Sequence, residues 1–233
     1  MATQRGPKIV TSGLVLCLDA ADTKSYSGSG TSWNDLSGNN VIGTLTNGPT
    51  FSSSNGGSIV FDGVNDFVSV PNQTALVNKS QFTLACWAKR RLSTSRVNIY
   101  QAIDLNNGIS LAALGDSNVY VEVSNGSHPY GYVANSGSNW QNFVMVFDGS
   151  LTGNSNRLKL YVNGVLQTLT FNGTIPATSS SSVNSIFCIG NTQGTGNNDY
   201  SDGNFAQVSI YNRALSVSEV LQNFNAQRGR FGI

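Results

Sequence analysis

The stretch Arg157-Leu-Lys-Leu-Tyr-Val-Asn163-Gly164 carries the clearest secondary-structure signal in this sequence. Leu158, Leu160 and Val162 alternate with Arg157, Lys159 and Tyr161, which is the period of a β-strand with one buried face. The Asn-Gly pair that follows enters the left-handed backbone region that a tight hairpin requires. The stretch therefore predicts a half-buried strand that turns back into an antiparallel partner.

The same signals recur along the whole chain. Residues 119–124 alternate three valines with Tyr120, Glu122 and Ser124, so the valines are expected to face a core. Near-continuous apolar runs at 13–18, 58–61, 82–88 and 143–147 predict central strands that are covered on both faces. Nine Asn-Gly or Asp-Gly pairs separate such runs, beginning at Asn47, Asn55, Asp62, Asn107, Asn125, Asp148, Asn163, Asn172 and Asp202. We therefore expect an all-β fold of roughly a dozen short antiparallel strands.

One segment near the end of the chain predicts a helix. Ser216-Val-Ser-Glu219 is a capping box, in which the serine hydroxyl and the glutamate carboxylate each satisfy a free backbone N–H. Val217, Val220, Leu221 and Phe224 follow with helical spacing, so this stripe is expected to pack against a sheet. The polar stretches elsewhere are too short for interdomain linkers. We expect an N-terminal arm at residues 1–12 and a single domain at 13–233.

Charge does not favour a highly charged partner. The 233 residues include 13 Lys and Arg against 12 Asp and Glu, for a net charge of +1, so we expect neither nucleic acid nor membrane as a partner. The run Lys89-Arg90-Arg91 is expected to be a solvated strand end. The N-terminal sequence lacks the apolar core of a secretory signal, which predicts synthesis in a cytoplasm without export.

The three cysteines, Cys17, Cys86 and Cys188, lie far apart in apolar runs. A metal site would need close pairs, and a reactive thiol would need a nearby base. We expect three buried free thiols.

Four ordered motifs in the C-terminal half resemble laminin-G-like domains of the concanavalin A-like lectin/glucanase superfamily. They are Trp140 to Gly149, Leu160 to Gly164, Ile189-Gly190 and Val208 to Ser216. Earlier segments at 18–22, 33–38, 61–68 and 82–87 are similar to the first strands and loops of that family. The resemblance covers roughly residues 13–226, and it implies a two-sheet antiparallel jelly-roll sandwich with one short C-terminal helix.

Within that family, both chain ends look most like single-domain members from tailed bacteriophages, especially cyanophages. The opening runs from Gly6 to Leu16, and the ending runs from Asn212 to Gly232. This resemblance implies a virion protein that decorates the capsid or another exterior part, with virion proteins as partners. Pro7, Ile9 and Val10 are candidates for pairing with a neighbour, and Phe231 is a fourth candidate assembly residue in a homo-oligomer. The alternative is that both ends dock on their own domain.

The sequence gives little support to catalysis. A retaining glycosidase of this superfamily uses two glutamates a few residues apart, whereas Glu122 and Glu219 are the only glutamates here. The lone His128 lies in a segment that predicts a hairpin tip, not a base held by a carboxylate. We therefore expect a protein that is not an enzyme.

Related domains often hold calcium at the sandwich rim through carboxylates and carbonyls, so calcium is the one cofactor that the resemblance leaves open. Asp199 and Asp202 are the candidate ligands, although the loop that contains them matches no ordered calcium motif. The segment Asp62 to Asp66 also offers oxygens, but a hairpin turn, for which the Asp-Gly pair supplies the backbone geometry, is the favoured interpretation.

Sugar binding needs an aromatic surface beside amides or carboxylates, since a pyranose offers both a C–H face and hydroxyls. Three segments supply this chemistry, and their candidate ligand residues are Trp33, Asp35, His128, Tyr130, Tyr132, Asn197 and Tyr200. Trp33 could instead pack beneath its loop, and the tyrosines could be core or interface. The two function hypotheses are a virion attachment module and an adhesin that binds host polysaccharide.

Overall fold

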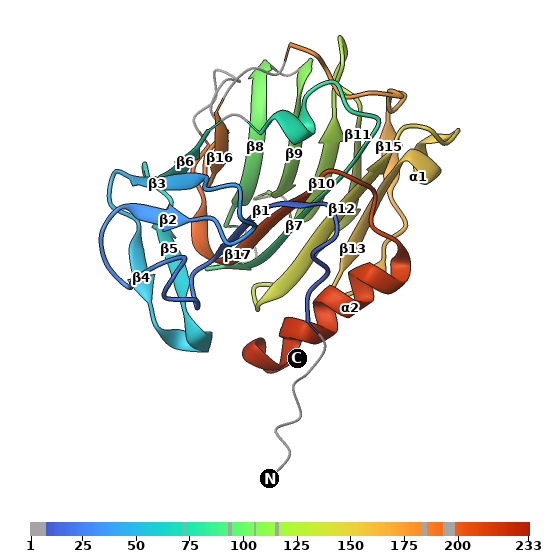
Figure 1. The fold of residues 1–233 in the computed structure, drawn as a ribbon. Coiled ribbons are helices and arrows are strands. Elements are labelled where there is room, and N and C mark those ends of the chain that lie inside the picture. The colour runs from blue at the N-terminus through green and yellow to red at the C-terminus, as the bar shows by residue number, and fades with distance from the viewer. Residues whose placement is uncertain are drawn as a thin grey trace.

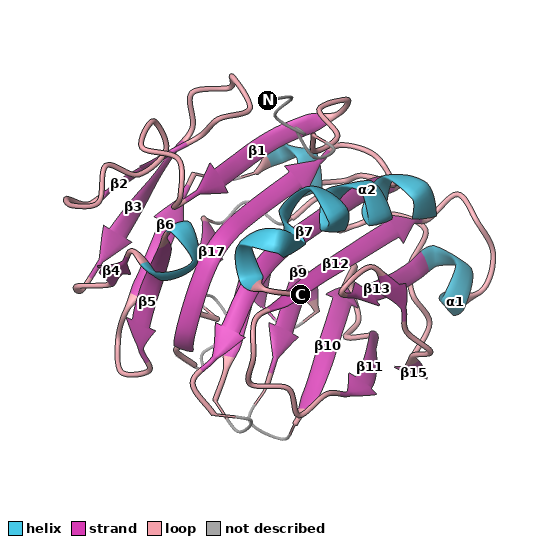
Figure 2. Cartoon of the chain, turned by 90° about the horizontal axis from the view of Figure 1, so that it is seen from below, coloured by secondary structure: helices cyan, strands magenta, loops and turns pink. Residues whose placement is uncertain are grey.

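The computed structural model describes residues 8–71, 73–92, 95–104, 106–114, 117–182, 186–192 and 199–233. The strands of these residues form two antiparallel sheets (Figure 1), as the sequence predicted. One short helix near the C-terminus lies on the sheet that contains β7, β12 and β17 (Figure 2). The expected all-β jelly-roll sandwich is confirmed.

The eight-stranded sheet contains, in spatial order, β14 (Val165–Leu166), β13 (Leu158–Val162), β12 (Gln141–Asp148), β7 (Gln81–Arg90), β17 (Asp202–Tyr211), β5 (Ser58–Asp62) and β4 (Thr50–Ser52). Its remaining strand, β1 (Leu14–Asp19), pairs with the second half of β17. The nine-stranded sheet contains β15 (Thr170–Asn172), β11 (Tyr130–Ala134), β10 (Asn118–Val123), β9 (Asn107–Ala113), β8 (Val97–Asp104), β16 (Phe187–Ile189), β6 (Phe67–Val70), β3 (Ile42–Thr46) and β2 (Ser32–Asn34).

The main core lies between the two sheets and uses the strand alternation read from the sequence. The three valines of β10 are fully buried, and Leu158, Leu160 and Val162 of β13 join them in one apolar cluster. Because successive side chains of a strand point to opposite faces, Tyr120 and Glu122 must lie on the outer face of the nine-stranded sheet. This face is the one turned away from the core.

The Asn163-Gly164 pair forms the expected hairpin. Both residues have positive φ, 52° and 77°, and Val162 pairs directly with Val165. Two other pairs lie inside strands instead, at the starts of β9 and β17. A Cβ on Gly203 would lie 2.2 Å from the Lys89 carbonyl oxygen, so glycine is needed there for a close backbone approach.

Helix α2 (Val217–Gln227) begins at Ser216 with the predicted capping box. Val220 and Phe224 are buried, but Val217 is 61% exposed and Leu221 is 45% exposed, so only half of the predicted stripe packs on the sheet. The other helical segments are α1 (Asn154–Arg157), η1 (Ser54–Gly56), η2 (Thr74–Leu76) and η3 (Arg228–Phe231). No helix among the described residues has the length and apolar character of a membrane span.

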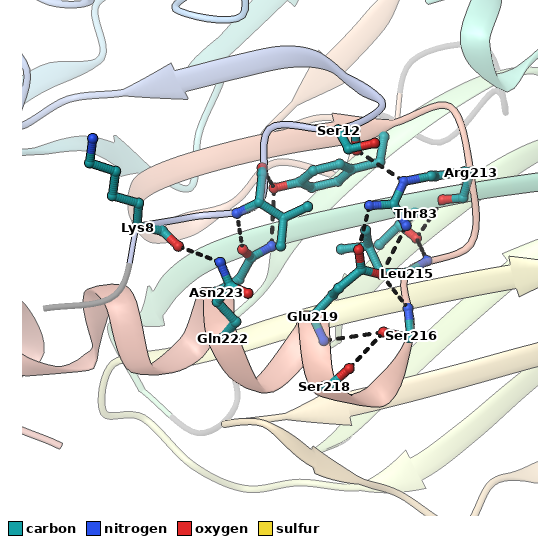
Figure 3. A network of polar contacts seen from close by, with 12 residues as sticks. Lys8, Ser12, Thr83, Arg213, Leu215, Ser216, Ser218, Glu219, Gln222 and Asn223 are labelled. Carbon is teal, nitrogen blue, oxygen red and sulfur yellow. Dashed lines mark hydrogen bonds and ion pairs between the residues drawn. The ribbon is translucent and has the colours of Figure 1, made fainter.

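Polar contacts tie residues 8–12 to α2 and the end of β17 (Figure 3). The Val10 backbone N–H donates to Asn223 Oδ1 at 2.7 Å, and the Tyr211 hydroxyl donates to the Val10 carbonyl at 3.0 Å. Val10 is only 8% exposed, and Ile9 is half-buried beside Val144 and Tyr211. Of the two interpretations that the sequence left open for this end, pairing with a neighbour or docking on its own domain, the structure shows Val10 docked on its own domain, with Ile9 half-buried next to it. Pro7 lies outside the described residues.

Phe231 also packs within its own domain. Its ring stacks on Trp87 with centroids 4.1 Å apart and contacts the Trp140 ring at 4.9 Å. Only 7% of Phe231 is exposed. Of the two interpretations left open for this end, the structure shows docking on its own domain, and the Phe231 side chain is not available to a neighbour.

The three cysteines are free and buried, as predicted. Burial raises the pKa of Cys17 to about 11 and that of Cys188 to about 12, so neither thiol is activated. The expectation for the Lys89-Arg90-Arg91 run is wrong at its centre. Arg90 is 1% exposed, and its guanidinium donates to the carbonyl oxygens of Gly137 and Asn135 at the end of the sandwich.

Candidate functional site

Three tyrosines meet on the outer face of the nine-stranded sheet. Tyr120 from β10 lies directly opposite Tyr132 of β11, and their rings stack with centroids 5.5 Å apart. Tyr130 lies on the same face of β11, two residues before Tyr132. Its ring meets the Tyr120 ring edge-on, with centroids 5.7 Å apart. All three residues are half-buried. We call Tyr120, Tyr130 and Tyr132 the tyrosine cluster.

A glycine on the opposite face allows this arrangement. Gly131 points toward the core between the two β11 tyrosines, where a Cβ would lie 2.9 Å from the Phe171 ring. Phe171 of β15 is the direct partner of Gly131, and it fills the space that a side chain would occupy. The β11 strand therefore keeps its pairing with β15 while both of its tyrosines face outward.

A buried carboxylate lies beside the tyrosine cluster. Glu122 is directly opposite both Tyr130 of β11 and Ser110 of β9, and its side chain is only 6% exposed. The Ser124 hydroxyl donates to Glu122 Oε1 at 2.5 Å, and the Ser110 hydroxyl donates to Oε2 at 3.3 Å. These donors orient the carboxylate and compensate for its burial.

His128 closes the same group of side chains from the tip of the β10–β11 hairpin. Its Nε2 lies 3.4 Å from Glu122 Oε2, and its ring contacts the Tyr130 ring at 5.6 Å. Hydrogen bonding to Glu122 raises the pKa of His128 above its ordinary value of 6.5, although partial burial opposes this change. The predicted hairpin tip is correct, but the histidine does have a carboxylate partner.

The described side chains around Glu122 do not form a Ser–His–acid triad or a pair of carboxylates. The two serine hydroxyls and His128 all contact Glu122, and no described serine donates to His128, so the Ser–His–acid relay is not formed. Within the described ranges, no second carboxylate contacts Glu122, and no group of three His, Cys, Asp or Glu gathers around a metal position. The arrangement can present tyrosine rings and their hydroxyls to a ligand, with the buried carboxylate beside them.

Two of the other predicted ligand residues have structural roles. Trp33 is fully buried in the main core, so the prediction that it contacts a ligand is wrong, and the alternative that it packs beneath its loop is confirmed. Asp35 accepts from the backbone N–H groups of Cys17 and Ser37, at 2.7 and 2.8 Å. Its carboxylate therefore holds the loop after β2 against β1.

The remaining candidates lie at the rim of the sandwich, except for Asn197, which is outside the described residues. Asp199, Tyr200 and Asp202 line an open hollow of about 580 Å³. Asp199 pairs with Arg96 at 2.5 Å, and Asp202 pairs with Arg91 at 2.8 Å. Each aspartate predicted as a calcium ligand thus already has a guanidinium counter-ion, with which a metal would have to compete.

A second hollow, of about 420 Å³, lies at residues from β1, η2 and the end of β17. Val15, Ala75, Gln73, Lys79 and Asn212 contribute to its lining. None of the predicted ligand residues reaches it.

The structure thus brings together His128, Tyr130 and Tyr132 and separates them from the rim candidates. Sequence reasoning missed Tyr120, Glu122, Ser110 and Ser124 as members of the same site. The alternation of residues 119–124 placed Tyr120 and Glu122 on one face, but pairing with β9 and β11 was needed to show their neighbours.

Comparisons with known proteins agree with this fold. Domain 4 of an extracellular arabinanase from Geobacillus stearothermophilus, solved in complex with arabinotriose, is similar over 92% of this chain and 98% of its own, with 21% identity and a TM-score of 0.65. The binding domain of botulinum neurotoxin serotype D matches over 94% of this chain, with 15% identity and a TM-score of 0.68. Trypanosoma rangeli sialidase in complex with sialic acid also matches over 94%, with 17% identity and a TM-score of 0.64.

This chain spans 53% of the neurotoxin chain and 33% of the sialidase chain, and these low identities show the fold alone. No curated protein sequence matches the chain significantly. A laminin-G family model matches residues 62–221, more than half of the 233 residues. The chain therefore belongs to the concanavalin A-like lectin/glucanases superfamily.

Proposed function

We propose that this protein binds saccharides through the tyrosine cluster and the polar side chains beside it. The observation that carries the proposal is the gathering of three half-buried tyrosines beside a buried, hydrogen-bonded carboxylate on one face. Tyrosine rings offer stacking surfaces for the C–H faces of sugars, and their hydroxyls add hydrogen bonds. The arabinotriose complex of a similar domain supports a glycan as the class of ligand.

The strand register gives the face an extended shape. Asn172, Tyr130, Glu122 and Ser110 lie opposite one another on β15, β11, β10 and β9. Three interstrand steps of roughly 4.8 Å make this row about 14 Å long. The Asn172 amide donates to the Tyr130 hydroxyl at 3.0 Å, which orients that hydroxyl. A short oligosaccharide lying across the strands would meet both aromatic and polar groups.

Isothermal titration calorimetry with oligosaccharides selected on a glycan array tests the proposal. Tyr130→Ala and Tyr132→Ala are each expected to weaken binding by about 1–2 kcal/mol, or about 5- to 30-fold in Kd. Tyr200→Ala is the matched control, because Tyr200 is a half-buried tyrosine at the rim and not on this face. The proposed site is contradicted if Tyr200→Ala weakens binding while Tyr130→Ala and Tyr132→Ala leave it unchanged.

We also propose that binding occurs without cleavage. The single carboxylate of the described site lacks the second acid that a retaining glycosidase needs. Release of reducing sugar from a bound polysaccharide, lost in Glu122→Gln, would overturn this view.

The resemblance of the chain ends to tailed-phage proteins supports a location on a virion as a compatible second proposal. An attachment surface would then have to lie away from Val10 and Phe231, which are used within the domain. Mass spectrometry of purified particles tests this location, and absence of the protein from mature virions would refute it.

A further inference from the structure

We propose that Glu122 makes the tyrosine cluster select neutral saccharides over acidic ones. This inference rests on the proposed function, since it concerns the class of saccharide that the same face accepts. It follows from the charges that the sheet presents, from the hydrogen bonds that hold Glu122, and from the contact of Glu122 with His128.

Among the described positions of β9, β10, β11 and β15, the outer face around the tyrosine cluster carries a single fixed charge. On β9, β10, β11 and β15, the described outer-face positions hold tyrosine, serine, asparagine, threonine, alanine and glycine, apart from Glu122. No lysine or arginine occupies these positions, so an acidic sugar placed on the tyrosines would have no cation from the four strands to pair with. It would instead lie close to the Glu122 carboxylate.

The carboxylate is held in place for this role. Its side chain is 6% exposed, and the hydroxyls of Ser124 and Ser110 donate to its two oxygens. The two hydroxyls fix the carboxylate beside the tyrosine rings, and partial exclusion of water extends the reach of its charge. At a separation of about 8 Å and an effective dielectric constant of about 40, repulsion of one ligand carboxylate reduces affinity about fivefold.

The protonation state of His128 controls how strongly Glu122 disfavours acidic saccharides. When protonated, it offsets the Glu122 charge from 3.4 Å away, and when neutral it leaves that charge uncompensated. A further charged group among the described residues near the hairpin tip is Asp104, which precedes the β8–β9 turn whose Asn106 carbonyl accepts from the Gly126 backbone N–H. The Asp104 carboxylate is already used by the Asn106 N–H and the Asn107 amide. Discrimination should therefore grow as the pH rises through the titration of His128.

The test is an array of glucose-, galactose- and arabinose-based oligosaccharides, each printed with a matched counterpart that carries one uronic acid. The folded wild-type protein is expected to prefer the neutral member about fivefold at pH 8 and less at pH 5.5. Glu122→Gln, which keeps an acceptor for the serine hydroxyls, should remove the preference at both pH values. His128→Gln should keep the full preference for the neutral member at both pH values.

Asp22→Asn is the matched control, since it removes one exposed carboxylate from a turn near β2, at the far edge of the sheet. Its preference should equal that of the wild type. The inference is overturned if Glu122→Gln keeps the preference, if Asp22→Asn loses it equally, or if the wild type binds acidic members as well as neutral ones. If the wild type binds neither member of any pair, the proposed function itself fails and the inference fails with it.

Discussion

Glu219→Gln is expected to lower the free energy of unfolding at pH 7 by about 1–2 kcal/mol. Glu219 forms a two-point ion pair with Arg213, at 2.6 and 2.8 Å, and it accepts from the Ser216 backbone N–H at 2.9 Å. Arg213 in turn donates to the Ser12 carbonyl (Figure 3). This network joins the segment after β17, the start of α2 and the N-terminal residues.

The magnitude follows from the titration of the carboxyl group. Hydrogen bonding to Arg213 lowers the pKa of Glu219 from 4.5 to about 2. That difference corresponds to roughly 3 kcal/mol of stabilisation. Both side chains are 28% exposed, so solvent screening reduces the figure to about half. Glutamine can still accept from the Ser216 N–H, so the variant isolates the loss of charge.

Urea denaturation at several pH values provides the assay. Because the folded pKa is below the unfolded value, the wild-type advantage is present above about pH 4.5 and is lost as the pH falls toward 2. The unfolding curves of wild type and variant should therefore converge near pH 2. A difference that stays constant from pH 7 to pH 2 would refute the assignment of this stabilisation to the ionised carboxylate.

Three further predictions follow from the same structure. Because Glu122 raises the pKa of His128, their pairing should add a few tenths of a kcal/mol to the free energy of unfolding below about pH 6.5, and this contribution should be lost as the pH rises. If the free energy of unfolding depends on pH identically in the wild type and in His128→Gln, the pairing is contradicted. Calcium at about 5 mM should shift the melting temperature by less than about 1 °C relative to chelator, because Asp199 and Asp202 are already paired with arginines; a larger calorimetric shift would show that the metal displaces them. Phe231→Ala should cost about 3 kcal/mol in urea denaturation and leave the mass measured by light scattering unchanged, whereas a lower mass at unchanged stability would restore an assembly role.

Local patterns were sufficient to predict most of the fold. Alternation in β10 and β13, the hairpin at Asn163 and the capping box at Ser216 each depend on residues close in sequence, and the structure contains all of them. Arg90 and Phe231 could not be predicted in this way, because their partners lie far along the chain or across the sandwich.

The candidate site was predicted only in part, because some of its contacts are local in sequence and others depend on strand pairing. Tyr130 and Tyr132 share a face by simple alternation, and His128 is nearby in the same hairpin. Their association with Glu122 depends on the exact register between β10 and β11, which a one-residue slip would abolish. The burial of Trp33 likewise depends on how the two sheets pack, which the local sequence does not reveal.

The most direct test of the central claim is to map the saccharide by nuclear magnetic resonance. Titration of isotope-labelled protein with an oligosaccharide that binds should shift the amide signals of Tyr120, Tyr130 and Tyr132 and of their neighbours on β10 and β11. Shifts confined to the rim around Asp202, or to the hollow beside Lys79, would contradict the account.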